Sequence, residues 1–350
     1  MVESDLRHSA IEIAKSETVN SQLTKMIKGT TKLLGVIGHP VEHSLSPAMH
    51  NAAISHLGVD FVYLPFPVKP GDLKAALAGF AAIGVRGFSI TIPHKQAILP
   101  LLSEVSPIAR AIGAVNTVYL TDKGWCGTNT DVEGFLAPLQ TGVFQTFQSD
   151  SDPPQPPLTR GENSLKVPLL KGDLGGSPGS DWSQKVAVIL GNGGAARAVV
   201  AGCAQLGCAE IHVVGRNEQN LGEFQQSWVN SPMPVQNLQV HTWDNLSRLI
   251  SQADLLVNTT PVGMYPQGEK SPVAAGEIDR ISAGAIVYDL IYTPNPTQFL
   301  KDAQIRGARA IDGLEMLVQQ GAAALKIWLN KESVPVDVMR QALRQHLGLD

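Results

Sequence analysis

The stretch KVAVILGNGGAA, residues 185–196, decides the fold of one half of this 350-residue chain. Its first six residues are mostly apolar and predict a buried strand, and the alanine-rich residues 195–206 predict a helix. The turn between them fits the pattern Gly-x-Gly-x-x-Ala, with Gly191, Asn192, Gly193, Gly194, Ala195 and Ala196. Between a strand and a helix this pattern indicates a Rossmann-type dinucleotide site, because its glycines let the backbone approach a pyrophosphate at the helix N-terminus.

The residues after the next expected strand, residues 210–214, bear on the choice of dinucleotide. A site for NAD usually has an acidic side chain here, which binds the ribose 2′-hydroxyl. This chain has Gly215, Arg216 and Asn217 instead, and a guanidinium pairs well with the 2′-phosphate of NADP. We therefore expect NADP as the cofactor, although Glu218 follows directly.

A second series of strands and helices lies toward the N-terminus. Short apolar runs predict strands at residues 34–38, 61–64 and 87–92, and helices fit residues 46–57 and 72–83. Ser46 suits the N-cap of the first helix, and Pro47 suits its first turn. Strands that alternate with helices predict a parallel βαβ sheet. The expected fold class is therefore α/β, with an N-terminal βαβ substrate domain, a Rossmann-type dinucleotide-binding domain and a cleft between them.

The remaining segments set the expected domain boundaries. Residues 1–31 are polar and mixed in charge, so we expect a disordered extension before a substrate-binding domain at residues 32–140. Residues 141–184 contain the run PPQPP and several glycines without a hydrophobic period, which predicts a disordered Pro/Gly-rich insertion or linker. An NADP-binding domain is expected at residues 185–311. The C-terminal helices, residues 312–350, are expected to return to the substrate domain.

Composition excludes several classes of function. The net charge of -4 provides no basic stripe, so nucleic acid is not an expected partner. No apolar run approaches the roughly 20 residues that a membrane span needs. Three cysteines without zinc-site spacing, and nine histidines without a His-x-x-x-His pair, indicate no metal site. The few cysteines favour a reducing compartment, and we expect a cytoplasmic protein.

Polar residues gather near the expected ends of strands in the first half. In open α/β sheets the carboxyl ends of the strands are where ligands bind. The candidate substrate residues found in this way are Ser44, Ser46, Thr91, Lys95, Asn116 and Asp131. Single serines and threonines in such places are often only capping or turn residues, so the assignment depends on the whole set.

Taken together, these segments resemble the shikimate dehydrogenase family from about residue 33 to residue 348, apart from the insertion. The resemblance rests on several short motifs in the family's order. They are SLSP at residues 44–47, TIPHK at 91–95, AVNT at 114–117, NTD at 129–131, the glycine loop at 191–195 and DGLEMLVQQ at 312–320. Two features depart from the family pattern, namely the long insertion and Glu315, which stands where a glycine is frequent.

The resemblance implies a role for each matching residue. Lys95 and Asp131 would be the catalytic pair. The substrate would be bound at its carboxylate and ring hydroxyls by Ser44, Ser46, Thr91, Lys95, Asn116, Asp131, Tyr292 and Gln320. The cofactor would be bound by Gly191, Asn192, Gly193, Gly194, Ala195, Gly215, Arg216, Asn217, Thr260, Leu290 and Gly313.

The implied reaction is the reversible NADPH-dependent reduction of 3-dehydroshikimate to shikimate, in chorismate and aromatic amino acid biosynthesis. Such a reduction needs a hydride and a proton, and the ammonium of Lys95 can supply the proton while Asp131 orients it. One alternative is a quinate/shikimate dehydrogenase that uses NAD, which Ser44 and Arg216 disfavour. Another is a non-catalytic ligand-binding relative, which would be expected to lack Lys95 or Asp131. A homodimer is a possible assembly that the sequence leaves open.

Overall fold

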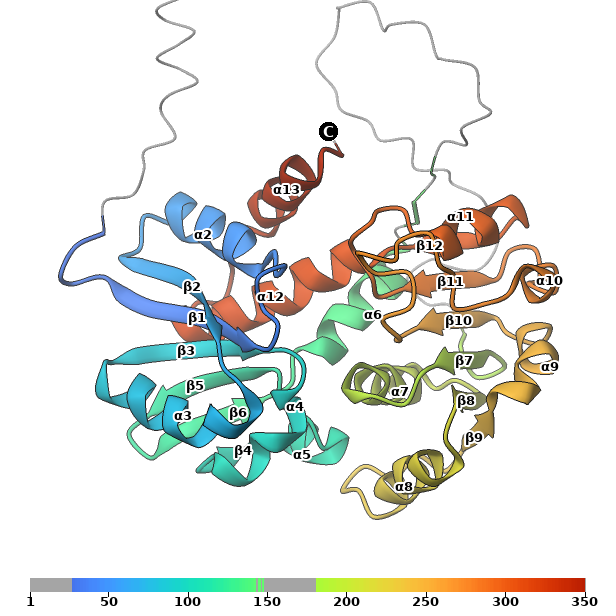
Figure 1. The fold of residues 1–350 in the computed structure, drawn as a ribbon, viewed down its shortest axis with the longest axis horizontal. Coiled ribbons are helices and arrows are strands. Elements are labelled where there is room, and N and C mark those ends of the chain that lie inside the picture. Colours follow the sequence, from blue (N-terminus) through green and yellow to red (C-terminus); the bar gives the residue numbers. More distant parts are fainter. Residues whose placement is uncertain (1–26, 143, 146, 148–180, 350) are drawn as a thin grey trace, which may run out of the picture.

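Two six-stranded sheets with their helices lie side by side in the computed structural model (Figure 1). We refer to them as the first half and the second half. The structure describes residues 27–142, 144–145, 147 and 181–349. The expected disordered extension and insertion therefore lie mostly outside the described residues. Within them, Thr30 and Thr31 donate hydrogen bonds to the carboxylate of Asp60, at 2.7 and 2.8 Å, so the end of the expected extension is bound to the first half.

The first sheet has the strand order β2-β1-β3-β5-β6-β4. Its strands are β1 (Lys32–Gly38), β2 (Phe61–Pro67), β3 (Val85–Ile90), β4 (Glu104–Val105), β5 (Thr117–Thr121) and β6 (Gly124–Thr128). The helices are α2 (Ser46–His56), α3 (Leu73–Ala82), α4 (His94–Ala97), α5 (Pro107–Ile112) and α6 (Asp131–Thr141), with 3₁₀ turns at Pro70–Asp72 and Leu99–Leu101. Strand β1 pairs in parallel with β2 and β3, as expected. The sheet is nevertheless mixed, because β5 and β6 form an antiparallel hairpin that was not expected.

One local expectation in this half is wrong. Leu45 occupies the N-cap of α2, and Ser46 is the first helical residue. The hydroxyl of Ser44 accepts the amide of Ser46 at 3.3 Å, so Ser44 satisfies a donor at the start of the helix. The Ser46 hydroxyl is consequently not needed as a cap.

The second sheet is parallel throughout and has the order β12-β11-β10-β7-β8-β9. Its strands are β7 (Val186–Leu190), β8 (Glu210–Gly215), β9 (Leu238–Thr242), β10 (Leu255–Asn258), β11 (Ile286–Asp289) and β12 (Arg309–Ile311). The helices are α7 (Gly194–Leu206), α8 (Glu218–Val229), α9 (Leu246–Ile250), α10 (Ala275–Ile278) and α11 (Gln298–Ile305), with a 3₁₀ turn at Trp243–Asn245. With β7 counted as strand 1, this is the Rossmann strand order 3-2-1-4-5-6. The switch point lies between β7 and β10, because the chain adds β8 and β9 on one side of β7 and β10 to β12 on the other.

Two helices connect the halves. Helix α12 (Gly313–Leu329) runs from the second half back to the first, where its apolar side packs with α2, and α13 (Val336–Leu347) covers it (Figure 1). Helix α6 lies against both α12 and α7. A Cβ at Gly134 would lie 2.7 Å from the carbonyl oxygen of Met316, so α6 and α12 approach closely. The position of α6 is therefore fixed from two sides.

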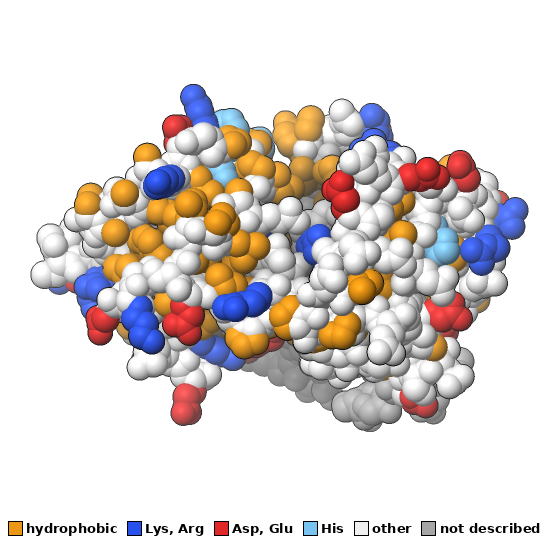
Figure 2. Space-filling model, turned by 90° about the horizontal axis from the view of Figure 1, so that it is seen from below, with side chains coloured by type: hydrophobic (Ala, Val, Ile, Leu, Met, Phe, Trp, Pro, Cys, Tyr) orange, Lys and Arg blue, Asp and Glu red, His pale blue; other side chains and the backbone are white. Residues whose placement is uncertain are grey.

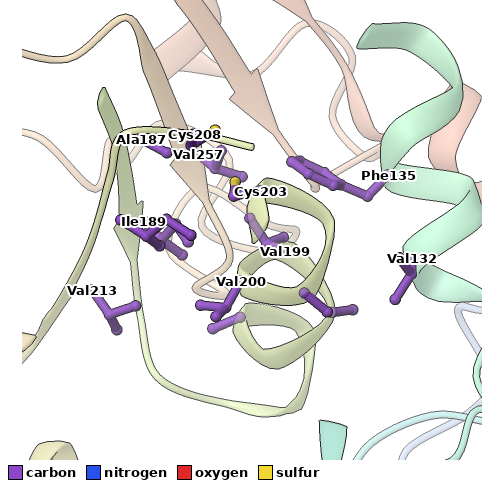
Figure 3. Packing of buried hydrophobic residues seen from close by; sticks show 14 of the residues in the cluster. Val132, Phe135, Ala187, Ile189, Val199, Val200, Cys203, Cys208, Val213 and Val257 are labelled. Atoms are coloured by element: carbon purple, nitrogen blue, oxygen red, sulfur yellow. The ribbon is translucent and has the colours of Figure 1, made fainter. Parts of the chain in front are cut away.

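The contact between α6 and α7 belongs to the largest hydrophobic core. Val132 and Phe135 of α6 lie beside α7, whose Val199 and Cys203 belong to the same buried cluster (Figure 3). A Cβ at Gly202 would come within 2.5 Å of the Phe135 ring, so only glycine allows this packing. Because Asp131 begins α6, this core also sets the position of Asp131.

Within the expected insertion, Thr141 and Gly142 end helix α6, and Gln145 and Phe147 are held on the second half. The amide of Gln145 donates to the carbonyl oxygen of Ala310 on the edge strand β12, at 2.9 Å. The side-chain oxygen of Gln145 accepts the amide of Asp312, at 3.2 Å. The amide of Phe147 donates to Gln304 at 3.1 Å. The expectation of disorder is therefore wrong at this end, because an unpaired sheet edge offers backbone partners.

Among the described residues no helix is both long and apolar enough to cross a membrane. Within the same ranges, no group of three or more histidine, cysteine or acidic side chains could hold a metal ion. Figure 2 shows acidic and basic side chains scattered over one face, and hydrophobic side chains gathered over the first half.

Candidate active site

The side chains of Lys95 and Asp131 form an ion pair at the edge of the first sheet. Lys95 lies in α4, just after β3, and Asp131 is the first residue of α6. The Lys95 Nζ lies 2.6 Å from Oδ2 of Asp131, and the side chains are 19% and 7% exposed. The lysine is therefore reachable from solvent, while the carboxylate that holds it is nearly buried.

A buried amide fixes the second oxygen of that carboxylate. Nδ2 of Asn116 donates to Oδ1 of Asp131 at 2.7 Å. Oδ1 of Asn116 accepts the amide of Thr130 at 2.8 Å, and the amide of Asp131 donates to Asn129 at 3.0 Å. One carboxylate oxygen thus faces Lys95 and the other faces Asn116, so neither is free to rotate away.

Asn116 lies at this edge of the sheet, but the expectation that it follows a strand is wrong. It precedes β5 and so lies at an amino end, not at the carboxyl end of a strand. Because β5 runs antiparallel to β3, its amino end lies at the same edge of the sheet as the carboxyl end of β3. Strand β6 then returns the chain to this edge, where Asp131 follows.

Gln320 joins the same cluster from α12, far away in the sequence. It is buried, and its side-chain oxygen lies 3.4 Å from Nδ2 of Asn116. Its own amide donates to the carbonyl oxygen of Leu317 at 2.8 Å. The side chain packs against α6, where a Cβ at Gly134 would lie 2.9 Å from Cβ of Gln320.

Ser44 and Thr91 lie on the loops that follow β1 and β3, and Ser46 is the first residue of α2. Ser46 is buried, and Ser44 is partly exposed beside it. The amide of Thr91 donates to Ile37 at 2.9 Å, and its methyl group faces Gly38, where any Cβ would lie 2.4 Å away. The three hydroxyl residues are therefore at the same edge as Lys95, and no hydrogen bond between described residues links them to it.

Tyr292 approaches the serines from the second half. It follows β11, and its ring packs beside the first-half core cluster that includes Met49 and Val318. Burial raises the pKa of the Tyr292 phenol, and the nearby backbone of Leu45 partly offsets that rise. Tyr292 therefore touches the residue between Ser44 and Ser46.

The glycine loop has the properties that a pyrophosphate would need. Gly191 has a φ of 101°, and a Cβ there would lie 2.8 Å from the hydroxyl of Thr259. Gly193 is the N-cap of α7, and a Cβ on it would meet no described atom within 4 Å. A Cβ on Gly194 would lie 3.7 Å from Cδ of Lys95. The loop is thus open along the helix N-terminus and lies beside the lysine.

The end of β8 continues this site. A Cβ at Gly215 would lie 3.4 Å from the side-chain oxygen of Asn192, so the two loops are neighbours. Asn217 caps α8 and accepts the amide of Asn220 at 2.9 Å. Arg216 is exposed and forms no ion pair with any residue in the described ranges. Its guanidinium is therefore available for a phosphate.

The remaining candidate cofactor residues are Thr260 after β10, Leu290 after β11 and Gly313, which begins α12 after β12. The hydroxyl of Thr260 donates to Oδ1 of Asn258 at 2.7 Å. A Cβ at Gly313 would lie 2.2 Å from the carbonyl oxygen of Leu290, so these two backbones touch and only glycine fits. The loops after β7 and β10 thus meet at the switch point, where a Cβ at Gly191 would lie 3.0 Å from Thr260, and the loop after β11 contacts the start of α12.

Sequence reasoning missed two buried polar residues behind these loops. Nδ2 of Asn258 donates to Oδ1 of Asp289 at 3.0 Å, and Thr297 donates to the other carboxylate oxygen at 2.7 Å. Burial raises the pKa of Asp289 to about 7, against the opposing effect of its hydrogen bonds. Both residues end apolar strands, which is a signal that could have identified them.

Comparison with protein families places both ends of the fold. A model of the shikimate dehydrogenase substrate binding domain matches residues 36–118. A model of the shikimate 5′-dehydrogenase C-terminal domain matches residues 313–344. The NADP(+)-dependent shikimate dehydrogenase of Trichormus variabilis is 63% identical over 324 residues, which are 93% of this chain and 100% of that protein. The Synechocystis enzyme of the same name is 53% identical and covers 92% of this chain and 98% of its own.

Solved structures give the same assignment. A shikimate dehydrogenase in complex with NADP+ has a TM-score of 0.73 and 32% identity over 92% of this chain and 98% of that chain. The Listeria monocytogenes shikimate 5-dehydrogenase, in complex with shikimate and NAD, has a TM-score of 0.72 and 31% identity over 91% and 99%. A 5-ketofructose reductase of Gluconobacter has a TM-score of 0.68 and 29% identity over 91% and 100%, so related folds carry other substrates.

Proposed function

The chain belongs to the shikimate dehydrogenase family, and we propose that Lys95 and Asp131 are the catalytic pair with which it interconverts 3-dehydroshikimate and shikimate. It is an NADP-dependent oxidoreductase that acts on a CH–OH group. Its reaction belongs to the shikimate pathway, which leads to chorismate and the aromatic amino acids. The observation that carries the proposed pair is its ion pair beside Gly194 of the glycine loop.

The residues at the switch point fit the cofactor. Gly191, Gly193 and Gly194 would hold the pyrophosphate, since the open N-terminus of α7 faces outward there. Arg216 would bind the 2′-phosphate as a charge-assisted partner. Thr260, Leu290 and Gly313 would border the rest of the bound cofactor. The other cofactor-binding residues would be Asn192, Ala195, Gly215 and Asn217. When bound, the nicotinamide supplies or accepts the hydride.

The polar residues of the first half would perform the proton transfer. In the reducing direction the Lys95 ammonium would donate a proton to the ketone oxygen as negative charge develops there. Asp131 would hold the ammonium in place with the oxygen that lies 2.6 Å from Nζ. Asn116 restrains the other oxygen, so the carboxylate keeps its direction during the reaction.

The substrate would be oriented by its other groups. We assign the hydroxyls of Ser44 and Ser46 to its carboxylate, with Tyr292 beside them. Thr91, Asn116 and Gln320 would recognise ring hydroxyls together with Asp131. Binding both ends of the substrate ring limits the orientations in which the reacting carbon meets the nicotinamide. Such orientation contributes a large part of the rate acceleration in many enzymes.

A direct assay tests this assignment. The purified protein is given shikimate or quinate with NADP or NAD, and the absorbance of the reduced cofactor is followed. The reverse reaction is measured with NADPH and 3-dehydroshikimate or 5-ketofructose. We expect the highest kcat/KM for shikimate with NADP. Faster turnover of quinate with NAD, or of 5-ketofructose, would overturn the proposed substrate.

Location and assembly complete the proposal. The three cysteines are all free and buried, which supports a reducing, cytoplasmic compartment. A homodimer would fit the apolar side chains gathered over the first half in Figure 2. In the same half α3 exposes several alanines, and Ile83, which follows it, is also exposed. Light scattering during gel filtration tests it, and a single species of monomer mass would reject the dimer.

A further inference from the structure

The turn between β1 and α2, residues 41–46, behaves as one unit that we call the serine turn. It carries Ser44 and Ser46, the proposed ligands of the substrate carboxylate. The amide of Ser44 donates to the carbonyl oxygen of Val41 at 3.1 Å, and the hydroxyl of Ser44 accepts the amide of Ser46 at 3.3 Å. A contact to any residue of this turn therefore acts on both serines.

Two tyrosines of the second half reach the serine turn, one on each side of Ser44. The ring of Tyr265 makes an edge contact with the ring of His43, with centroids 5.8 Å apart and an interplanar angle of 62°. Tyr292 packs against the same core cluster as Leu45, and the backbone of Leu45 acts on the Tyr292 phenol by lowering its pKa. The two neighbours of Ser44 are thus both held from across the molecule.

Each tyrosine lies on a segment that also carries a proposed cofactor residue. Tyr265 follows Thr260 in the loop after β10, and Tyr292 follows Leu290 after β11. A group bound at Thr260 or Leu290 therefore acts on a loop that ends at the serine turn. Only a few residues separate Thr260 from Tyr265, and Leu290 from Tyr292.

Hydrogen bonds join these two loops into one body. Asn258 accepts the hydroxyl of Thr260 at 2.7 Å and donates to Asp289 at 3.0 Å, which ties the bases of the loops together. Further along, the amide of Tyr265 donates to the carbonyl oxygen of Thr293 at 3.2 Å. The loops are thus connected both at the cofactor end and at the end that touches the serine turn.

We propose that Tyr265 is a positioning residue that couples the cofactor site to the substrate carboxylate site, so that NADP and shikimate bind cooperatively. The proposal rests on the proposed roles of Thr260 and the serine turn. Tyr265 is chosen over Tyr292 because its side chain is 62% exposed and belongs to no core cluster of the described residues. The contact of the Tyr265 ring with His43 is therefore the interaction that we assign to this large, exposed side chain. Fixing the cofactor loops would hold that ring against His43 and pre-organise the serine turn.

Shikimate and NADPH together form a dead-end complex, because both are reduced, and this allows binding to be measured without turnover. Calorimetry of shikimate with and without saturating NADPH gives the ratio of its two Kd values. We expect NADPH to tighten shikimate binding in the wild type by about 5- to 150-fold, the usual range of such coupling. In Tyr265→Ala this ratio should fall below about twofold, while the Kd of NADPH alone changes by less than about twofold.

Matched variants separate coupling from general damage. Tyr265→Phe should keep the wild-type ratio, because the contact uses the ring and not the hydroxyl. Met264→Ala, an exposed neighbour, should also keep it. His43→Ala should lower the ratio of the two Kd values as much as Tyr265→Ala does. The double variant should lower it no further, since both changes remove the same contact between His43 and Tyr265.

The outcomes are distinct. A wild type that binds both ligands without coupling overturns the proposal, and so does a Tyr265→Ala protein that keeps its ratio. If Tyr265→Ala weakens NADPH alone by as much as it weakens shikimate, Tyr265 merely supports the cofactor loop and the proposal is wrong. A wild type that binds no shikimate with or without NADPH would contradict the proposed function instead.

Discussion

Arg340 on α13 donates two hydrogen bonds to the carboxylate of Glu315 on α12, at 2.7 and 2.8 Å. The Glu315 side chain is 11% exposed and that of Arg340 is 31% exposed. Burial alone would raise the pKa of Glu315, but the bonds from Arg340 and Gln319 outweigh it, and the pKa lies below its ordinary value. The residue that departs from the family's frequent glycine therefore has a partner that clamps α13 onto α12.

Arg340→Leu is predicted to lower the free energy of unfolding by about 1–3 kcal/mol, because it leaves the nearly buried Glu315 carboxylate without its cationic partner. The double variant Glu315→Leu/Arg340→Leu should recover most of the loss, since neither charge is then left alone. Urea denaturation measures both. Equal urea midpoints for wild type and Arg340→Leu would show that the pair contributes nothing.

The same pair predicts a pH dependence in acid. The folded pKa of Glu315 is lower than its unfolded pKa, so its stabilisation is present above the ordinary value of 4.5 and is lost as the pH falls through the folded pKa. The difference between wild type and Arg340→Leu should therefore shrink when denaturation is repeated below about pH 4.

Asp289 predicts the opposite trend nearer neutrality. Its folded pKa of about 7 lies above the ordinary 3.8, so the folded state binds the proton more tightly. Stability from this residue is complete below the ordinary pKa and is lost as the pH rises through about 7, at up to about 1.4 kcal/mol per pH unit. Asp289→Asn cannot titrate, so its stability relative to wild type should rise between about pH 5 and pH 8. The exposed Asp122→Asn serves as control, and parallel curves for wild type and Asp289→Asn would reject the raised pKa.

The choice of cofactor is predicted to depend on Arg216. Arg216→Asp should raise the KM for NADP by about ten- to hundredfold, the effect of losing one charge-assisted hydrogen bond, and should improve NAD relative to NADP. Arg280→Asp makes the same change of charge at another exposed arginine of the second half and should leave the ratio unaltered. A retained NADP preference in Arg216→Asp would exclude it as the phosphate ligand.

Much of the fold could be predicted because its parallel strands are continuous apolar runs. Residues 186–190 and 286–289 are buried throughout or nearly so, as parallel strands covered on both faces must be. The hairpin strand GWCGT of β6 has two glycines and no such run, and β12 has three residues, so neither has a clear pattern. These strands form because neighbouring strands supply hydrogen bonds, which local sequence does not reveal.

The candidate site divides in a similar way. Ser44, Thr91 and Lys95 follow predicted strands, so their common edge could be expected from topology. Gln320 reaches the site because α12 returns from the second half to the first. Asn116 reaches the same edge only through the antiparallel strand β5, which was not predicted. The pairing of Glu315 with Arg340 depends on how two helices cross, which no local motif encodes.

The catalytic pair is tested most directly by kcat in Lys95→Ala, Asp131→Asn and the double variant, measured with shikimate and NADP. Each single change should lower kcat by roughly 10²–10⁴, with NADPH binding retained because Lys95 and Asp131 belong to the first half. If the two residues act as one unit across their 2.6 Å ion pair, the double variant should be little worse than the poorer single variant. A Lys95→Ala protein with near-normal kcat, or losses that multiply in the double variant, would contradict the mechanism.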